Sequence, residues 1–151
     1  YPYHTAIQSI YNITMSSITI EVTVKSSVEK VWEYWTEPQH ITNWNYASDD
    51  WCCPKAVNNL VVGGRFSYTM AAVDGTNSFD FSGVYTQIER LKKINYKLDD
   101  NRQVQIIFEK NSESTTKIIE NFEIESENSE KLQRDGWQAI LNNFKKYSES
   151  L

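Results

Sequence analysis

The spacing of apolar residues changes once along this chain, and that change does most to limit the folds open to it. From residue 65 to residue 124, apolar and polar residues alternate in short runs separated by turn signals such as Asp74-Gly75. This alternation predicts strands with one buried face, and short strands in succession predict an antiparallel meander. From about residue 128 to residue 147, apolar residues recur at helical spacing instead, which predicts one helix of about 30 Å.

The chain before this meander predicts one more strand and two short helices. Apolar and polar residues alternate over residues 18–25, which is typical of a half-buried strand. Ser26 and Glu29 form a capping-box pattern ahead of a helix over about residues 27–35. A second short helix is predicted over about residues 37–44.

The length of the chain indicates one domain with a substantial core. The chain has 151 residues, of which 40% are hydrophobic and 23% are charged, as in an ordinary globular protein. The regular pattern begins near Met15, so we expect a single domain over residues 15–151. Residues 1–14 carry no clean period, and we interpret them as an upstream extension of natural or cloning origin.

Charge and cysteine usage argue against several classes of function. The net charge is −5 and no basic stripe is present, so we expect no nucleic-acid partner. No apolar run approaches the roughly 18 residues of a membrane-spanning helix. Cys52 and Cys53 are adjacent and do not form a disulfide framework, which favours a cytoplasmic protein. With only His4 and His40 and no C-x-x-C spacing, we expect no metal site and no cofactor.

Four segments of the chain carry a resemblance to a known family. They are SSVEKVWEYWTEPQHITNW, VGGRFSY, FDFSGVYTQIERLKKINY and RDGWQAILNNFKKY. Together they resemble the START-like (SRPBCC) superfamily, in the branch named for activators of the heat-shock protein ninety ATPase, over residues 16–150. The resemblance implies an α+β helix-grip fold, in which a curved antiparallel sheet of six to seven strands wraps around the long C-terminal helix. It also implies a cavity between sheet and helix, and the chain is similar to the single-domain members of the branch.

Gly136 stands inside the predicted C-terminal helix, where glycine costs about 1 kcal/mol relative to alanine. Two explanations remain open at this point. The glycine leaves room for a ligand in the implied cavity, or it allows tight packing of the helix on a strand without any ligand.

Aromatic residues on the presumed inward face of the sheet and on the helix predict a cavity for a flat apolar or amphipathic ligand. The alternative is that most of these rings simply fill the core. The candidate ligand-binding residues are Trp44, Tyr46, Trp51, Phe66, Tyr68, Met70, Phe81, Tyr85, Phe108, Phe122, Gly136, Trp137, Ile140 and Phe144.

The favoured hypothesis is a carrier or sensor of a small hydrophobic molecule. One alternative is a chaperone-associated module that binds protein and stimulates an ATPase. Another is a cyclase-like or hydrolase-like enzyme that uses cavity tyrosines with Asp49 or Asp50, two carboxylates in a predicted loop over residues 45–59. No nucleophile motif such as G-x-S-x-G is present, so no catalytic residue is assigned.

Overall fold

Seven antiparallel strands form one curved sheet in the computed structural model, which describes residues 16–151. The extension proposed for residues 1–14 lies outside the described residues. The elements in chain order are β1 (Ser17–Val24), α2 (Val28–Thr36), α3 (Pro38–Ile41), β2 (Trp51–Asn58), β3 (Arg65–Ala72), β4 (Ser78–Glu89), β5 (Lys93–Leu98), β6 (Gln103–Ser112), β7 (Thr115–Glu123) and α4 (Glu130–Glu149). The predicted α+β helix-grip arrangement is confirmed.

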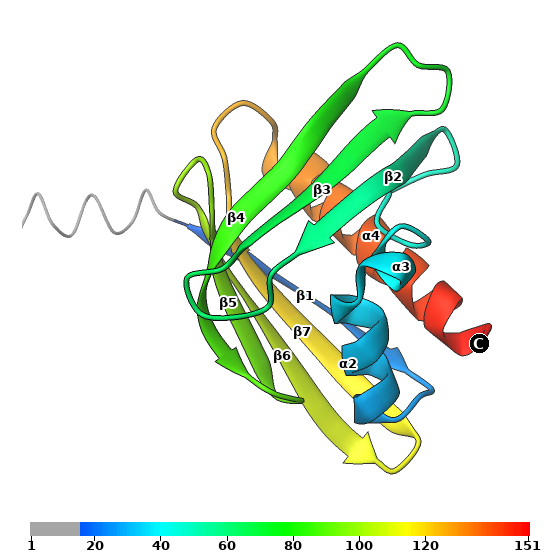
Figure 1. The fold of residues 1–151 in the computed structure, drawn as a ribbon. Helices are drawn as coiled ribbons and strands as arrows, with labels where there is room; N and C mark the ends of the chain where they lie inside the picture. Colours follow the sequence, from blue (N-terminus) through cyan, green and yellow to red (C-terminus); the bar gives the residue numbers. More distant parts are fainter. Residues whose placement is uncertain (1–15) are drawn as a thin grey trace, which may run out of the picture.

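The strands follow the order β1-β7-β6-β5-β4-β3-β2 across the sheet. In Figure 1 the β2–β4 half diverges from the half made by β5, β6, β7 and β1, and the helices occupy the space between the two halves. β4 and β5 join the halves, and their close contact depends on Gly83. A Cβ at Gly83 would lie 2.6 Å from the carbonyl oxygen of Lys97 and 3.0 Å from the ring of Phe66. Only glycine fits there without a shift of the backbone.

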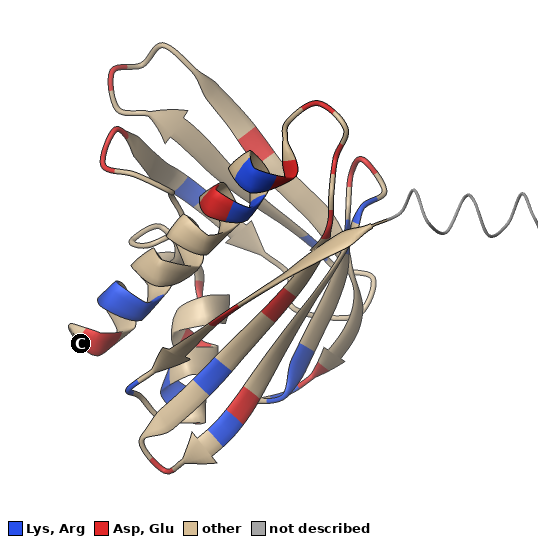
Figure 2. Ribbon diagram, turned by 180° about the vertical axis from the view of Figure 1, so that it is seen from behind, with Lys and Arg blue, Asp and Glu red and all other residues tan. Residues whose placement is uncertain are grey.

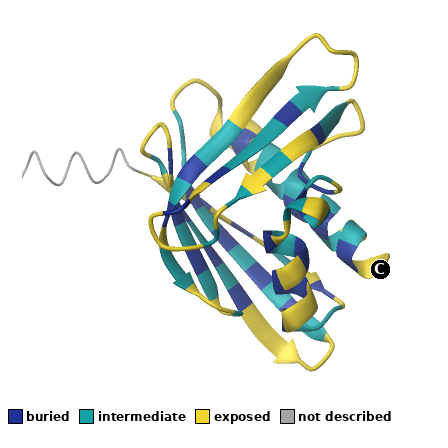
Figure 3. Cartoon of the chain, viewed as in Figure 1, coloured by how far each residue is buried: buried dark blue, intermediate teal, exposed yellow. Residues whose placement is uncertain are grey.

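The core fills the lower half of this space, where α2 and the end of α4 pack on the sheet (Figure 3). Trp35 contacts Phe108 and Phe144 in edge-to-face geometry, with ring centroids 5.8 and 4.9 Å apart. Phe144 also contacts Trp44 at 4.9 Å. Edge-to-face pairs of this kind stabilise a core beyond the burial of their area. This aromatic cluster closes one end of the space between helix and sheet.

α4 is held against the outer edge of β1 by side chains rather than by strand pairing. Arg134, Gln138 and Lys145 donate to the backbone carbonyls of alternate residues of β1, at distances of 3.2, 3.3 and 2.7 Å. The acceptors are the oxygens of Thr19, Glu21 and Thr23. Because the helix is tied to this edge, it stands away from β2, β3 and β4 at the other end of the sheet.

The outer face of the sheet carries charged side chains of both signs, which Figure 2 shows from behind. Lys117 on β7 and Glu21 on β1 form an ion pair across that face, with nitrogen and oxygen 3.3 Å apart. The inner face is mostly apolar, so β1 and the strands from β3 to β7 present the alternation that the sequence predicted.

Two details of the sequence interpretation were wrong. Residues 51–58 form β2 rather than part of a loop, because β2 is an edge strand, where Pro54 at a bulge between Cys52 and Lys55 is tolerated. The N-cap of α2 is Ser27, whose hydroxyl accepts from the backbone N–H of Lys30 at 3.3 Å, and not Ser26.

Candidate functional site

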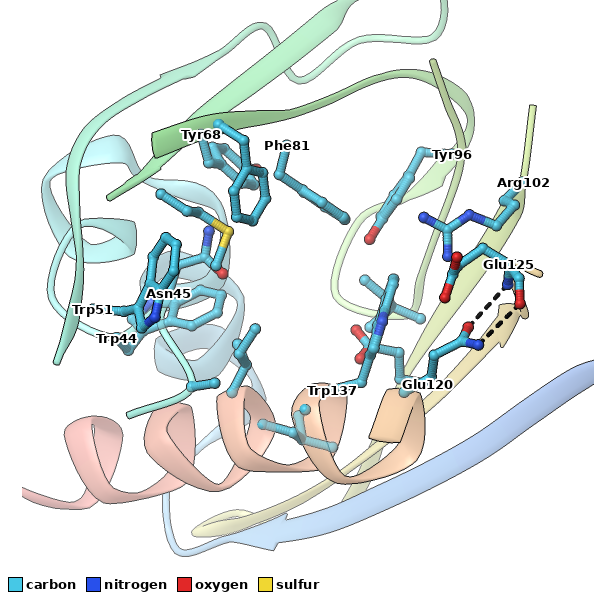
Figure 4. A pocket seen from close by; sticks show the side chains of 18 of the residues that line it. Trp44, Asn45, Trp51, Tyr68, Phe81, Tyr96, Arg102, Glu120, Glu125 and Trp137 are labelled. Atoms are coloured by element: carbon cyan, nitrogen blue, oxygen red, sulfur yellow. Dashed lines mark hydrogen bonds between the residues drawn. The ribbon is translucent and has the colours of Figure 1, made fainter. Parts of the chain in front are cut away.

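A cavity of about 490 Å³ lies between α4, the inner face of the sheet from β2 to β7 and the segment that precedes β2. Figure 4 shows its side chains pointing inward from all three sides. The predicted ligand-binding residues that line this cavity are Trp44, Trp51, Tyr68, Met70, Phe81, Tyr85, Gly136, Trp137 and Ile140.

The other predicted site residues lie elsewhere. Phe66, Phe108, Phe122 and Phe144 are buried and fill the core behind the cavity wall. Tyr46 is half-buried outside the cavity, and its hydroxyl donates to the carbonyl of Asn43. Strand parity placed Phe66, Phe108 and Phe122 on the correct face and the helical stripe placed Phe144, but neither pattern shows which inward side chains border open space.

Trp137 connects the helix to the sheet at the centre of the site. Its indole stacks on Phe122, with centroids 4.0 Å apart and planes 7° from parallel. It also meets Phe81 edge-to-face at 5.8 Å. A ring held on two sides keeps a fixed position, so Trp137 is a rigid wall rather than a mobile plug.

Gly136 faces open space next to this tryptophan. A Cβ built on it would meet nothing within 4 Å. The explanation by tight helix-to-strand packing therefore does not hold. The missing side chain leaves room in the cavity, which Gly136 lines.

The cavity opens to solvent near Phe79 and Leu132. Both line the cavity, and they are 52% and 60% exposed. Phe79 lies on β4 and packs against Trp51 at 5.9 Å, whereas Leu132 lies in the first turn of α4. Because both side chains line the cavity and reach solvent, they form part of its rim.

Glu120 is the cavity residue that sequence reasoning missed. It lies on β7 between Ile20 and Ile106 of the neighbouring strands, lines the cavity and is only 5% exposed. Burial raises the pKa of its carboxyl from 4.5 to about 8. Its backbone is paired with β1 and β6, whereas its carboxyl oxygens border the cavity, and no described residue is seen to hydrogen-bond to them. The signal was present in the sequence, because Glu120 shares the inward parity of Ile118 and Phe122.

Asn45 is a second polar group at the cavity wall. It is 7% exposed and lies beside the Cys53 thiol, whose pKa burial raises and this amide partly lowers, but its Nδ2 has no hydrogen-bond partner of good geometry among the described residues. It lies on the opposite side of the cavity from Glu120 (Figure 4). Buried amide groups are nearly always hydrogen-bonded, so an unpartnered one that borders a cavity is a group available to a ligand.

The cavity tyrosines differ in what their hydroxyls do. Tyr85 donates to Oδ1 of Asn58 at 2.5 Å, and Asn58 donates in turn to the carbonyl of Thr36 at 2.7 Å. This hydroxyl is therefore a structural link. Tyr96 on β5 points its hydroxyl into the cavity (Figure 4), and burial, with the nearby Glu120 carboxyl, raises its pKa well above the ordinary value.

The end of the cavity near the start of α4 is polar and well ordered. Gln133 accepts from the backbone N–H of Glu125 at 2.9 Å and donates to the carbonyls of Glu125 and Asn128. Arg102 also lines this end, and its guanidinium pairs with Asp100 at 2.8 Å. Gln133 and Arg102 therefore already have hydrogen-bond or ion-pair partners. The bonds of Gln133 also hold the loop between β7 and α4 in place.

The remaining candidates from the sequence do not form a site. Asp49 and Asp50 are exposed outside the cavity, and the Ser48 hydroxyl donates to Asp50. Neither carboxylate therefore lies beside the cavity tyrosines, as the hypothesis of an acid–base pair would require. Cys53 is buried in β2, where desolvation raises its thiol pKa. His40 is half-buried rather than exposed, with its Nδ1 hydrogen-bonded to the Tyr147 hydroxyl at 2.7 Å.

Between residues 16 and 151, no three His, Cys, Asp or Glu side chains gather in a way that suits a metal ion. No helix in the same range is long and apolar enough to cross a membrane.

A curved antiparallel sheet around a C-terminal helix, with an apolar cavity between them, defines the helix-grip class of α+β proteins. The family model described as activator of Hsp90 ATPase homolog 1-like protein matches residues 25–149, and the chain belongs to this family. Membership supports a ligand-binding domain or a module associated with the Hsp90 ATPase, and it specifies neither a ligand nor a partner. No curated protein matches the sequence.

Solved structures agree with this assignment. The solution structure of an AHSA1-like protein from Aeromonas hydrophila is 39% identical, with a TM-score of 0.84, and the match covers 89% of this chain and 93% of that one. A solution structure from Cytophaga hutchinsonii is 51% identical with a TM-score of 0.77, covering 89% and 92%. A crystal structure from Nitrosomonas europaea, 18% identical with a TM-score of 0.75 over 89% and 94%, shares the fold.

Proposed function

We propose that the protein binds a small apolar or amphipathic molecule in the cavity between α4 and the inner face of the sheet. One observation carries the proposal, namely a cavity of about 490 Å³ that stays open inside an aromatic shell. Protein interiors are normally packed to crystal density, and open spaces of roughly 300–1,000 Å³ are characteristic of ligand sites.

The shape of the site favours a flat ligand. Trp137 presents an indole face that is fixed by Phe122 and Phe81, and Tyr68 stacks near Phe81 with planes 21° apart. Trp51 and Phe79 flank the opening. A planar apolar body gains most from such walls, because aromatic rings prefer stacked or edge-to-face contact.

The indole N–H signals of the tryptophans provide a direct test. Trp51 and Trp137 line the cavity, whereas Trp32 does not and packs in the core against Phe108 at 5.2 Å. Addition of 2-isopropenylnaphthalene, an uncharged bicyclic hydrocarbon, should shift the signals of Trp51 and Trp137 and leave Trp32 unchanged. Shifts of all signals alike, or of none, would contradict binding in the cavity.

The natural ligand requires a second measurement. The protein should be purified from its own cells without detergent and weighed by native mass spectrometry, followed by solvent extraction of any bound molecule. A mass excess that disappears on extraction supports a carrier or sensor. A mass equal to that of the chain alone, together with no indole shifts, would contradict the proposal.

A second candidate function is binding to a chaperone. The family description names the Hsp90 ATPase, and the β2–β3 region exposes the apolar side chains of Val57, Val61 and Val62. Exposed apolar groups that gather on one segment mark contact sites for proteins. The test measures the ATPase rate of an Hsp90 chaperone alone, with the protein, and with its Val62→Ser variant. The variant is the control, because it removes one of the exposed apolar side chains.

A further inference from the structure

Glu120 carries a carboxyl group at the centre of the inward face of β7, where the fold does not require a polar side chain. Its neighbours on the same face, Ile118 and Phe122, are fully buried, and its partners across the sheet are Ile20 and Ile106. A buried polar group without a partner costs about 1–3 kcal/mol, which an aliphatic side chain at this position would avoid. The carboxyl therefore points to a partner that enters the cavity.

We propose that Glu120 donates a hydrogen bond to an uncharged oxygen of the ligand, so that the site selects flat apolar molecules that carry a carbonyl group. The proposal rests on the cavity function proposed above and names the class of ligand. Figure 4 shows the Glu120 carboxyl and the Tyr96 hydroxyl both directed into the same region of the cavity, beside the Trp137 ring. Two O–H groups that converge on one region can bind both lone pairs of a single carbonyl oxygen.

The protonation state of Glu120 supports a donor rather than an anion. Its pKa is about 8 and desolvation is the cause, so the carboxyl is neutral at pH 7. The other titratable or charged groups on the cavity wall are Tyr68, Tyr85, Tyr96, Arg102 and Glu125. Arg102 is engaged with Asp100 and with the carbonyl of Glu123. None of these groups supplies a positive charge that would hold Glu120 ionised.

The same surroundings disfavour an amine as the ligand. A protonated amine would have to meet an ionised Glu120, and the pair would be buried among Ile106, Trp137 and Tyr96. The desolvation of two charges in such a place cancels much of their attraction. A carbonyl compound enters without any change of charge.

Three probes of one shape separate these possibilities. 2-Acetylnaphthalene carries a carbonyl oxygen, 2-isopropenylnaphthalene carries a CH₂ group in its place, and 1-(2-naphthyl)ethylamine carries a cation. Calorimetric titrations at about pH 6 should give the ketone about tenfold tighter binding than the alkene, the upper end of what one neutral hydrogen bond supplies. This preference should fall sharply at about pH 9.5, where Glu120 is ionised and cannot donate, and where only the Tyr96 hydroxyl, whose pKa is raised well above its ordinary value, remains as a donor.

Two variants of Glu120 provide the controls. Glu120→Gln keeps an N–H donor that does not titrate, so it should retain a ketone preference that is the same at both pH values. Glu120→Leu should reduce the preference to the same low value at both pH values, because only the Tyr96 hydroxyl remains to donate. Unchanged indole N–H signals of Trp32 confirm that each variant is folded at each pH.

Each other outcome has a definite meaning. A ketone preference that is independent of pH in the wild type, or that is undiminished in Glu120→Leu, overturns the role of Glu120 and points to Tyr96 or Asn45 as the donor instead. Tighter binding of the amine overturns the choice of an uncharged ligand. If the alkene binds and the ketone binds no better, this inference fails while the cavity function stands. If no probe binds, both fail together.

Discussion

Gly136→Leu tests whether the space beside α4 is a cavity or a packing gap. Gly136 is in the interior of a 20-residue helix, and a Cβ at this position meets nothing within 4 Å. Leucine forms helix better than glycine by about 0.8 kcal/mol, and no neighbour has to move for its first carbon. We therefore expect a gain of about 0.5–1 kcal/mol, which for a chain of this length raises the unfolding midpoint by about 2–3 °C.

The same substitution should close the site. The leucine side chain projects into the cavity next to Trp137, where a ligand would stack. We expect Gly136→Leu to abolish the indole shifts that 2-isopropenylnaphthalene causes in the wild type. Gly136→Ala is the matched control, because it gains a similar helix propensity and adds only one carbon. It should be as stable as the leucine variant and should still bind the probe.

The stability result can refute this reasoning independently of the binding result. If the helix packed tightly on the sheet, leucine would overpack the contact and cost about 1–3 kcal/mol. A fall in the midpoint for Gly136→Leu but not for Gly136→Ala would therefore show that the space closes in solution. Probe binding that persists in a stable Gly136→Leu variant would remove Gly136 from the site.

Three further predictions follow from burial, packing and capping. The pKa of Glu120 is 4.5 when unfolded and about 8 when folded, so the folded state holds a proton that the unfolded state has lost between these values. Wild-type stability measured by urea unfolding should therefore fall from about pH 4.5 to about pH 8 by on the order of 4 kcal/mol, and Glu120→Gln should remove that decline. Phe144→Ala should cost about 3–5 kcal/mol, because Phe144 is fully buried, whereas Trp51→Ala at the half-exposed rim should cost less in stability and more in probe affinity. Ser27→Ala should lower the free energy of unfolding by about 1 kcal/mol through loss of the α2 cap, and Ser26→Ala should leave it almost unchanged; equal effects would contradict the observed cap.

The architecture could be predicted from the sequence because it depends on local periodicity. Alternation over each strand and the helical stripe near the end of the chain are properties of neighbouring residues. β2 was missed because the adjacent cysteines and Pro54 look like a loop, and only its place at the edge of the sheet makes a strand acceptable there.

The site could be predicted only in part, because the position of α4 decides which side chains border open space. Phe66 and Tyr68 lie two residues apart on the same face of β3, yet Phe66 is fully buried and Tyr68 lines the cavity. The alternation along the strand predicts the same environment for both residues. What separates them is where α4 lies, and that depends on bonds such as Lys145 to Thr23, which join residues far apart in the sequence.

The attachment of α4 to β1 also bears on self-association. A sheet rich in aromatic residues grows into polymers when its end strands offer free backbone groups to another chain. At β2 that offer is interrupted by Pro54 and a bulge. At β1 the carbonyls of alternate residues are already occupied by Arg134, Gln138 and Lys145. Lifting the helix would open the cavity and uncover a strand edge in the same movement, so the bonds that keep the cavity in shape also shield the edge of β1.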